Sequence, residues 1–190
     1  KIKVQYIINP RGIPVNSHYL AIDDGTAFIG ASEILRLSPE FDKNKNPLYL
    51  TSYGMGQLIK DAINRKFKNI YLGLGGTSTV DAGIGMAQAL GIKFLSKTGV
   101  RLCPKKGKYF MGLDLSSVND IVWDSISPIY KDVSITALCD SKINIPQMSV
   151  PTNMKISKYF DKDRVAINDR LKTSLFKYSR IIGKNLEEIY

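Results

Sequence analysis

The chain has 190 residues, of which 44% are hydrophobic, and it carries a net charge of +10. A chain of this length can bury a core without covalent or metal staples. Its two cysteines are too few for a disulfide framework or a four-cysteine zinc site, and its single histidine nearly excludes histidine triads and multi-histidine metal sites. We therefore expect a protein of the reducing cytoplasm. We also expect no membrane span, because no apolar run approaches the roughly 20 residues that a bilayer requires.

The first elements predict a β-hairpin followed by a helix. Residues Lys1–Asn9 alternate and are rich in β-branched side chains, which is typical of a strand, and Val15–Asp23 predicts a second strand. The Pro-Arg-Gly sequence between them is a turn signal. The histidine, His18, is then a strand residue that faces solvent or a neighbour. Thr26 is suited to cap a helix over Ala27–Leu37.

Strands and helices alternate through the middle of the chain. The predicted elements are a helix that begins within Thr51–Gly56, a strand at Lys68–Gly73, a helix over Val80–Leu90 that ends at Gly91, and strands at Ile92–Leu95 and Val133–Leu138. This alternation predicts an α/β fold in which helices pack on a layered, mostly parallel sheet with the N-terminal hairpin added to it. We expect residues 1–190 to form one such domain.

The last segment predicts a long C-terminal helix. Its apolar residues recur at steps of three and four, which places them on one stripe. A stripe of this kind is either core or a surface for a partner, and core is the commoner outcome. The stripe consists of Ile167, Leu171, Leu175, Tyr178, Ile182, Leu186 and Ile189.

The positive charge is spread along the chain rather than focused. One local cluster contains Arg101, Lys105, Lys106 and Lys108, and aromatic residues are not interleaved with the basic ones. We interpret most of the excess charge as a solvated surface, so a nucleic-acid partner is disfavoured. A polyanion binder that uses this cluster is a weaker alternative, which a steep salt dependence of binding would reveal.

The segment Leu72–Gly85, LGLGGTSTVDAGIG, follows a predicted strand and opens a predicted helix. It is neither a Walker A loop nor a G-x-G-x-x-G motif, because Ser78 stands where the third glycine is required. Free amides at a helix start attract anions. Gly83 and Gly85 each cost the predicted helix about 1 kcal/mol relative to alanine, so close packing or a close ligand should offset them. The residues alone leave both a packing turn and an anion-binding loop open.

Two other segments carry similar signals. Thr51–Leu58 (TSYGMGQL) is rich in hydroxyls and glycine, and it is either a simple helix cap or a second helix N-terminus directed at the same ligand. Asp140 comes just past a predicted strand, where α/β folds place catalytic groups, although an aspartate there is equally a turn former. If the three segments converge, one pocket would hold Asp81, Asp140 and two amide-rich loops, which suits Mg²⁺ with a polyol or a phosphate.

These segments, in this order, resemble the type I glycerate kinase family. Its pattern runs approximately T-x-Y-G-[TS]-G-E-L-I, then G-[IL]-G-G-S-A-T-x-D-G-G-x-G, then A-L-G and later C-D-x-x-N-P-L. The corresponding stretches here are Thr51–Ile59, Gly73–Gly85, Ala89–Gly91 and Cys139–Asp140. The DDGTA stretch at Asp23–Ala27 also fits the family pattern, and the resemblance covers nearly the whole chain. The glycine–aspartate motif is the one that is specific to the family.

The resemblance implies transfer of the γ-phosphate of ATP to D-glycerate, with ATP and Mg²⁺ as cofactors. It implies catalytic roles for Asp81 and Asp140, either of which would help to place glycerate or Mg²⁺. It also implies a set of residues that hold the substrate or a phosphate. This set is Thr51, Tyr53, Gly54, Gly56, Gly75, Gly76, Thr77, Ser78 and Thr79.

Several positions depart from the family pattern. A glutamate expected in the first helix is replaced around Gly30, the glutamate of G-E-L-I is Gln57, and one motif glycine is Ala82. The N-P-L after Asp140 is blurred, and we expect the family's glycine-rich stretch and its second α/β domain to be absent. Because family chains are longer and this one begins with Lys1, we expect an excised substrate-side domain that is inactive alone. The alternative is a catalytically degraded binding or assembly domain; the oligomeric state stays open, a homodimer included.

Overall fold

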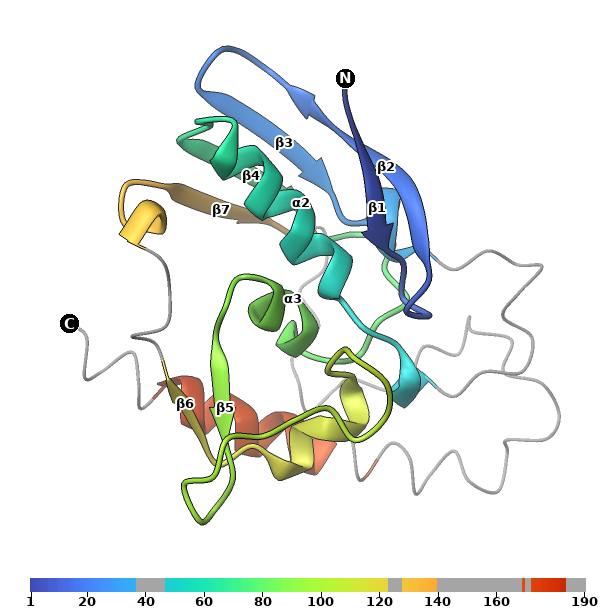
Figure 1. The fold of residues 1–190 in the computed structure, drawn as a ribbon, viewed down its shortest axis with the longest axis vertical. Helices are drawn as coiled ribbons and strands as arrows, with labels where there is room; N and C mark the ends of the chain where they lie inside the picture. Colours follow the sequence, from blue (N-terminus) through green and yellow to red (C-terminus); the bar gives the residue numbers. More distant parts are fainter. Residues whose placement is uncertain (37–46, 123–127, 140–168, 170–171, 184–190) are drawn as a thin grey trace, which may run out of the picture.

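The computed structural model describes residues 1–36, 47–122, 128–139, 169 and 172–183 (Figure 1). Asp140, one of the two predicted catalytic aspartates, lies outside the described residues. The same holds for part of the predicted C-terminal stripe, namely Ile167, Leu171, Leu186 and Ile189. In the part of the chain that is described, no helix has both the length and the apolar character needed to cross a membrane.

Five strands form the main sheet in the order β1-β2-β3-β4-β7. Their bounds are Ile2–Ile8 (β1), Pro14–Ala21 (β2), Thr26–Gly30 (β3), Asn69–Gly73 (β4) and Ser134–Leu138 (β7). The first three strands pair antiparallel, whereas β3, β4 and β7 run parallel. The α/β class and the N-terminal hairpin are therefore confirmed. The sheet is mixed rather than mostly parallel, because the hairpin joins β3 through an antiparallel edge.

The helix predicted over Ala27–Leu37 is wrong at its start. Residues Thr26–Gly30 form β3, in which buried residues alternate with half-buried ones and Ala27 and Ile29 point inward. Pairing on both edges, with β2 and with β4, satisfies the backbone groups that a helix would have satisfied internally. The helix is shortened to α1 (Ser32–Leu35). The period-two pattern of TAFIG is a strand signal, which the capping signal at Thr26 masks.

One face of the main sheet is covered by α2 (Tyr53–Asn64), which crosses it in Figure 1. The helical spacing of apolar residues in this part of the sequence predicts a buried stripe, and the stripe does pack on Ile29, Ile70 and Leu72 of the sheet. The buried apolar residues of the stripe are Met55, Leu58, Ile59, Ala62 and Ile63.

A shorter helix, α3 (Ile84–Ala89), lies between α2 and a second hydrophobic core (Figure 1). Helix 172–183 contributes Leu175 and Tyr178 to this core, so the described part of the predicted stripe packs as core. The strand predicted at Ile92–Leu95 belongs here and not to the main sheet. The other described elements are β5 (Lys93–Leu95) paired antiparallel with β6 (Asp120–Val122), and the 3-10 segments η1 (Pro47–Tyr49), η2 (Gly112–Ser117) and η3 (Pro128–Tyr130).

The boundaries of α3 show which glycines the helix contains. The predicted end is confirmed, because Gly91 has a φ of +97° and its amide donates to the carbonyl of Gln88 at 3.0 Å, as in a left-handed helix cap. The start lies at Ile84 rather than Val80. Gly83 precedes the helix with a φ of +74°, a conformation that favours glycine, so it costs the helix nothing.

Two glycines let α2 approach its neighbours closely. A Cβ at Gly54 would collide with the carbonyl oxygen of Ile8 at the end of β1. A Cβ at Gly56 would collide with the carbonyl oxygen of Met86 in α3. Both glycines, which the sequence predicts as ligand-binding residues, thus permit contact between backbones.

We expect Gly54→Ala to lower the free energy of unfolding by about 1–3 kcal/mol, because the added methyl group must displace the backbone of β1. Chemical denaturation followed by circular dichroism measures the change. Gly183→Ala is the matched control, since Gly183 also lies in a helix and nothing stands within 4 Å of its Cβ position. That substitution should raise stability by up to about 1 kcal/mol. Equal effects at the two positions would contradict the packing role of Gly54.

Candidate functional site

The glycine-rich segment leaves the main sheet where three parallel strands end. Gly73, the last residue of β4, pairs with Gly30 at the end of β3 and with Leu138 at the end of β7. The pairing continues as Ala31 donates to the carbonyl of Gly73 at 2.7 Å and Leu74 donates to that of Leu138 at 3.0 Å. Open α/β sheets bind their ligands at this edge, outside the carboxyl ends of the strands.

Asp81 is buried, with 1% of its surface exposed, and it connects the segment to α2. Its Oδ2 accepts hydrogen bonds from the backbone amide of Ser52 at 2.7 Å and from the Ser52 hydroxyl at 2.8 Å. The amide of Gly85 donates to the same oxygen at 3.3 Å, and that of Gly83 donates to Oδ1 at 3.2 Å. The Ser52 hydroxyl also accepts a hydrogen bond from the Met86 amide at 2.9 Å. One carboxylate therefore joins the start of α2 to the start of α3.

The surroundings of Asp81 act on its charge in two opposite ways. Burial raises the pKa of the carboxyl, and the hydrogen bonds from Ser52, Gly83 and Gly85 oppose this rise. The positive end of the α2 dipole also favours a carboxylate at Ser52. Burial, followed by the negative charge of Asp81, raises the pKa of the Tyr178 hydroxyl in helix 172–183. The α2 N-terminus thus holds a carboxylate from within the chain, where the sequence left open an external ligand.

Thr51 and Gly85 complete the packing around this carboxylate. Thr51 is fully buried, and its Oγ1 accepts a hydrogen bond from the Tyr53 amide at 3.2 Å. A Cβ at Gly85 would collide with Oγ1 of Thr51 and would lie 3.0 Å from Oδ2 of Asp81. Close packing is therefore the compensation for the helix cost of Gly85.

The outer part of the segment remains accessible. Gly76 and Thr77 are exposed and Gly75 is half-buried, while the φ of Gly76 is +71°. Ser78 turns inward, because its hydroxyl and its amide both donate to the carbonyl of Leu35, at 2.6 and 3.0 Å. The segment thus combines the two alternatives that the sequence leaves open. Its second half is a packing turn, and its first half is an accessible loop that contains Gly75 and Gly76.

The predicted binding residues divide into two groups by burial. Those in the buried group serve packing and hydrogen bonding inside the chain, and those in the accessible group can meet a ligand. The buried group is Thr51, Gly54, Gly56 and Ser78, and the accessible group is Tyr53, Gly75, Gly76, Thr77 and Thr79. Tyr53 packs its ring on that of Tyr109, with 4.5 Å between the centroids.

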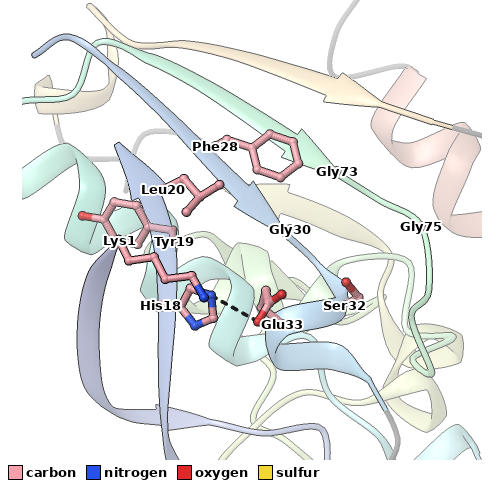
Figure 2. A pocket seen from close by; sticks show the side chains of 10 residues that line it. All are labelled: Lys1, His18, Tyr19, Leu20, Phe28, Gly30, Ser32, Glu33, Gly73 and Gly75. Atoms are coloured by element: carbon pink, nitrogen blue, oxygen red, sulfur yellow. Dashed lines mark ion pairs between the residues drawn. The ribbon is translucent and has the colours of Figure 1, made fainter. Parts of the chain in front are cut away.

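A cavity of about 280 Å³ adjoins the accessible loop (Figure 2). Gly30, Gly73 and Gly75 line it at the strand ends, together with an ion pair in which Nε2 of His18 lies 3.3 Å from Oε2 of Glu33. The interpretation of His18 as a strand residue that faces a neighbour is confirmed. Glu33 is missed from the sequence, because a helix through residues 27–37 hides the strand end that brings this side chain to the cavity.

Two departures from the family pattern have a local explanation. The side-chain amide oxygen of Gln57 accepts a hydrogen bond from the Ile8 amide at 2.8 Å, which a glutamate carboxylate could also do. Ala82 has a φ of +49°, in the left-handed region that favours glycine. A glycine at position 82, as in the family pattern, would remove this strain.

The described residues do not fit the magnesium ion that the resemblance implies. Magnesium requires oxygen ligands with free lone pairs in near-octahedral geometry. The two oxygens of Asp81 already accept four hydrogen bonds in a buried site. Within residues 1–36, 47–122, 128–139, 169 and 172–183, no cluster of three His, Cys, Asp or Glu side chains could hold a metal. Asp81 is therefore a poor magnesium ligand.

Sequence comparison assigns the fold and motifs to one family. Residues 1–145 match the family model described as "Glycerate kinase family", and the chain belongs to this family. The chain is similar to a glycerate 2-kinase of Escherichia coli (strain K12), with 37% identity over 138 residues that cover 71% of this chain and 34% of that protein. It is also similar to a glycerate kinase of Halalkalibacterium halodurans, with 32% identity over 139 residues that cover 73% of this chain and 35% of that protein.

A solved structure supports the same assignment. The fold is similar to a crystal structure described as a glycerate kinase 2 from Salmonella typhimurium LT2, with a TM-score of 0.77 and 26% identity. The similarity covers 98% of this chain and 48% of the solved chain. The chain thus matches about a third of the length of its curated relatives and about half of the solved structure.

We expect Asp81→Asn to lower the free energy of unfolding by about 1–3 kcal/mol at neutral pH, because the new amide N–H₂ would face a backbone donor. Burial raises the pKa of Asp81, so the folded protein binds this proton more tightly than the unfolded chain does. The wild type therefore loses stability as the pH rises from the ordinary aspartate range through the folded pKa. The difference in unfolding free energy between the wild type and the variant should shrink over the same range.

Urea denaturation of both proteins between about pH 4 and pH 8 measures this deficit. The control is Asp24→Asn, because Asp24 is exposed and its substitution should change stability little. A deficit of Asp81→Asn that grows with pH would mean that the hydrogen bonds outweigh the effect of burial.

We expect Ala82→Gly to raise the free energy of unfolding by up to about 1 kcal/mol. The left-handed conformation costs an L-residue about 1–2 kcal/mol, and glycine avoids this cost. The larger entropy of glycine in the unfolded chain offsets part of the stabilisation. Thermal unfolding measures the shift. Ala87→Gly in α3 is the control and should cost about 1 kcal/mol. Parallel losses in both variants would show that the turn at Ala82 is not strained.

Proposed function

We propose that the chain forms the glycerate-binding part of an ATP-dependent kinase that phosphorylates D-glycerate. The observation that carries the proposal is the accessible loop Gly75–Thr77, which belongs to the family-specific motif and stands at the carboxyl ends of three parallel strands. Membership of the glycerate kinase family supports the choice of substrate. ATP as the donor rests on the resemblance of the motifs.

The proposed reaction requires stabilisation of negative charge more than covalent chemistry by the protein. A hydroxyl oxygen of glycerate forms a bond to the γ-phosphorus of ATP while the bond between that phosphorus and the bridging oxygen of ADP breaks. ADP leaves, and the hydroxyl proton passes to solvent. Fixed N–H donors stabilise the charge on the phosphoryl oxygens. In this proposal the amides of Gly75, Gly76 and Thr77 contact either that group or the carboxylate of glycerate.

Asp81 has a positioning role in this proposal. Its hydrogen bonds to Ser52, Gly83 and Gly85 set the direction in which the loop leaves the sheet, and no contact with the substrate is required of it. The buried Thr51, Gly54 and Gly56 act through the same packing. Asp140 keeps the catalytic role that the sequence suggests for it, because it follows β7 in the chain.

The alternative is a binding or assembly domain that has lost catalysis. Two observations favour it, namely the glycine at position 30 in place of a glutamate and the left-handed alanine at position 82. As a binding domain, the alternative also requires D-glycerate to bind at the same loop. The two functions differ in turnover, which the alternative lacks.

We expect Gly76→Ala to lower kcat/KM for D-glycerate at least tenfold, because a Cβ at a φ of +71° and 3.2 Å from the Cβ of Ser32 must move the loop amides. The measurement is ADP formation in a coupled assay with the full protein that carries this chain. Gly99→Ala is the matched control, since Gly99 has a φ of +76° and nothing stands within 4 Å of its Cβ position.

The assay separates the two functions. Turnover with a selective loss in Gly76→Ala supports the kinase. Saturable D-glycerate binding by calorimetry without turnover supports the alternative. Absence of both binding and turnover in the wild type would overturn both, and equal losses in the two glycine variants would remove the loop from the site.

A further inference from the structure

A carboxylate and an imidazole face each other at the cavity beside the accessible loop (Figure 2). Nε2 of His18 lies 3.3 Å from Oε2 of Glu33, and the two side chains are 25% and 48% exposed. Both groups therefore remain in reach of a ligand. Gly30, Gly73 and Gly75 also line the cavity, and the Phe28 ring packs beside Gly73, so a ligand at Glu33 would also lie near the loop at Gly75.

Rigid elements hold this pair in place. His18 lies in β2, where its backbone pairs with Lys3 of β1 in the N-terminal hairpin. Glu33 lies in α1, which follows directly from β3. The ion pair therefore ties the hairpin to the strand end from which the site is built. Groups on such elements are positioned more accurately than groups on loops.

Glu33 fills the space that a side chain at position 30 would enter. A Cβ built on Gly30 would meet Cγ of Glu33 at 3.6 Å, which is ordinary van der Waals contact. The family pattern has a glutamate around position 30, and this chain has glycine there and glutamate three residues later. The carboxylate of Glu33 thus lies at the cavity that a glutamate at position 30 would also reach.

We propose that Glu33, oriented by His18, is the residue that binds a hydroxyl group of the hydroxy-acid substrate and supplies the carboxylate that the family pattern places near Gly30. This inference rests on the proposed function and names a specificity residue for it. The glutamate oxygens accept a hydrogen bond from the substrate hydroxyl. An analogue without this hydroxyl cannot form the hydrogen bond and therefore binds more weakly. Lys1, which also lines the cavity, provides positive charge for the carboxylate of the substrate.

The size of the cavity favours a small acid. Pockets for drug-sized ligands measure about 300–1,000 Å³. The cavity measures about 280 Å³, just below that range, which suits a three-carbon hydroxy acid.

The test is steady-state kinetics of the full protein with D-glycerate and ATP as varied substrates. Glu33→Gln keeps the shape and removes the charge, and we expect KM for D-glycerate to rise at least tenfold while KM for ATP stays within twofold. Glu33→Ala alone should also raise KM for D-glycerate. The double variant Gly30→Glu/Glu33→Ala moves the carboxylate to position 30, and its KM should return most of the way to the wild-type value. His18→Gln should raise the same KM by a smaller factor.

The matched control is Asp132→Asn. Asp132 is also an exposed, ion-paired carboxylate, 4.0 Å from Lys68, but it lies before β7, at the opposite end of the strands. Its KM values should not change. A KM for D-glycerate that stays within twofold in Glu33→Gln overturns the inference and leaves the kinase proposal standing. Failure of the Gly30→Glu rescue overturns the shared carboxylate position.

Calorimetry keeps the comparison independent of turnover. The dissociation constant of D-glycerate is measured for the wild type, Glu33→Gln and Asp132→Asn. A selective loss of affinity in Glu33→Gln supports the subsite even in a protein without kinase activity. Equal affinity in all three proteins overturns it, and a wild type that turns over no glycerate contradicts the kinase proposal alone.

Discussion

The carboxylate of Asp81 is the interaction on which the arrangement of the site depends. It is buried and accepts four hydrogen bonds, from residues that begin α2 and from the turn that leads into α3. A buried charge is tolerated only where donors replace its hydration. Because these donors come from two helices, the carboxylate fixes the direction of both at the edge of the main sheet. In the proposed function, this aspartate supports the loop before it.

Close backbone contact is the second consequence of this arrangement. The two helices can share one carboxylate only if their backbones come near each other, and glycines at positions 56 and 85 provide the space. A family motif rich in glycine is usually interpreted as a loop that admits a ligand. Here Gly54, Gly56 and Gly85 admit another part of the same chain, whereas Gly75 and Gly76 stay accessible.

The strand ends determine where that partner can bind. Gly30, Gly73 and Leu138 are aligned by parallel pairing, so the accessible loop and the first turn of α1 open on the same edge of the sheet. Glu33 reaches the cavity there because β3 ends directly before its helix. A site that has lost one acidic position can keep its chemistry when a neighbouring element brings another carboxylate to the same space.

Local patterns in the sequence were enough for much of the fold. Strand alternation indicated the N-terminal hairpin, helical spacing indicated the buried stripe of α2, and the glycine after α3 marked its end. The motifs around Asp81 indicated the family, because residue types and their order are properties of the chain itself. The start of β3 was missed, since whether TAFIG becomes strand or helix depends on the strands that pair with it.

The sequence by itself therefore determined the N-terminal hairpin, the helices α2 and α3 and the family to which the chain belongs. Only the tertiary structure decided which groups the motif residues contact. Ser52 and Asp81 are 29 positions apart, and His18 and Glu33 belong to different elements. Burial and hydrogen bonding between such residues follow from how the chain folds back on itself, so no local pattern could separate a supporting aspartate from a ligand-binding one.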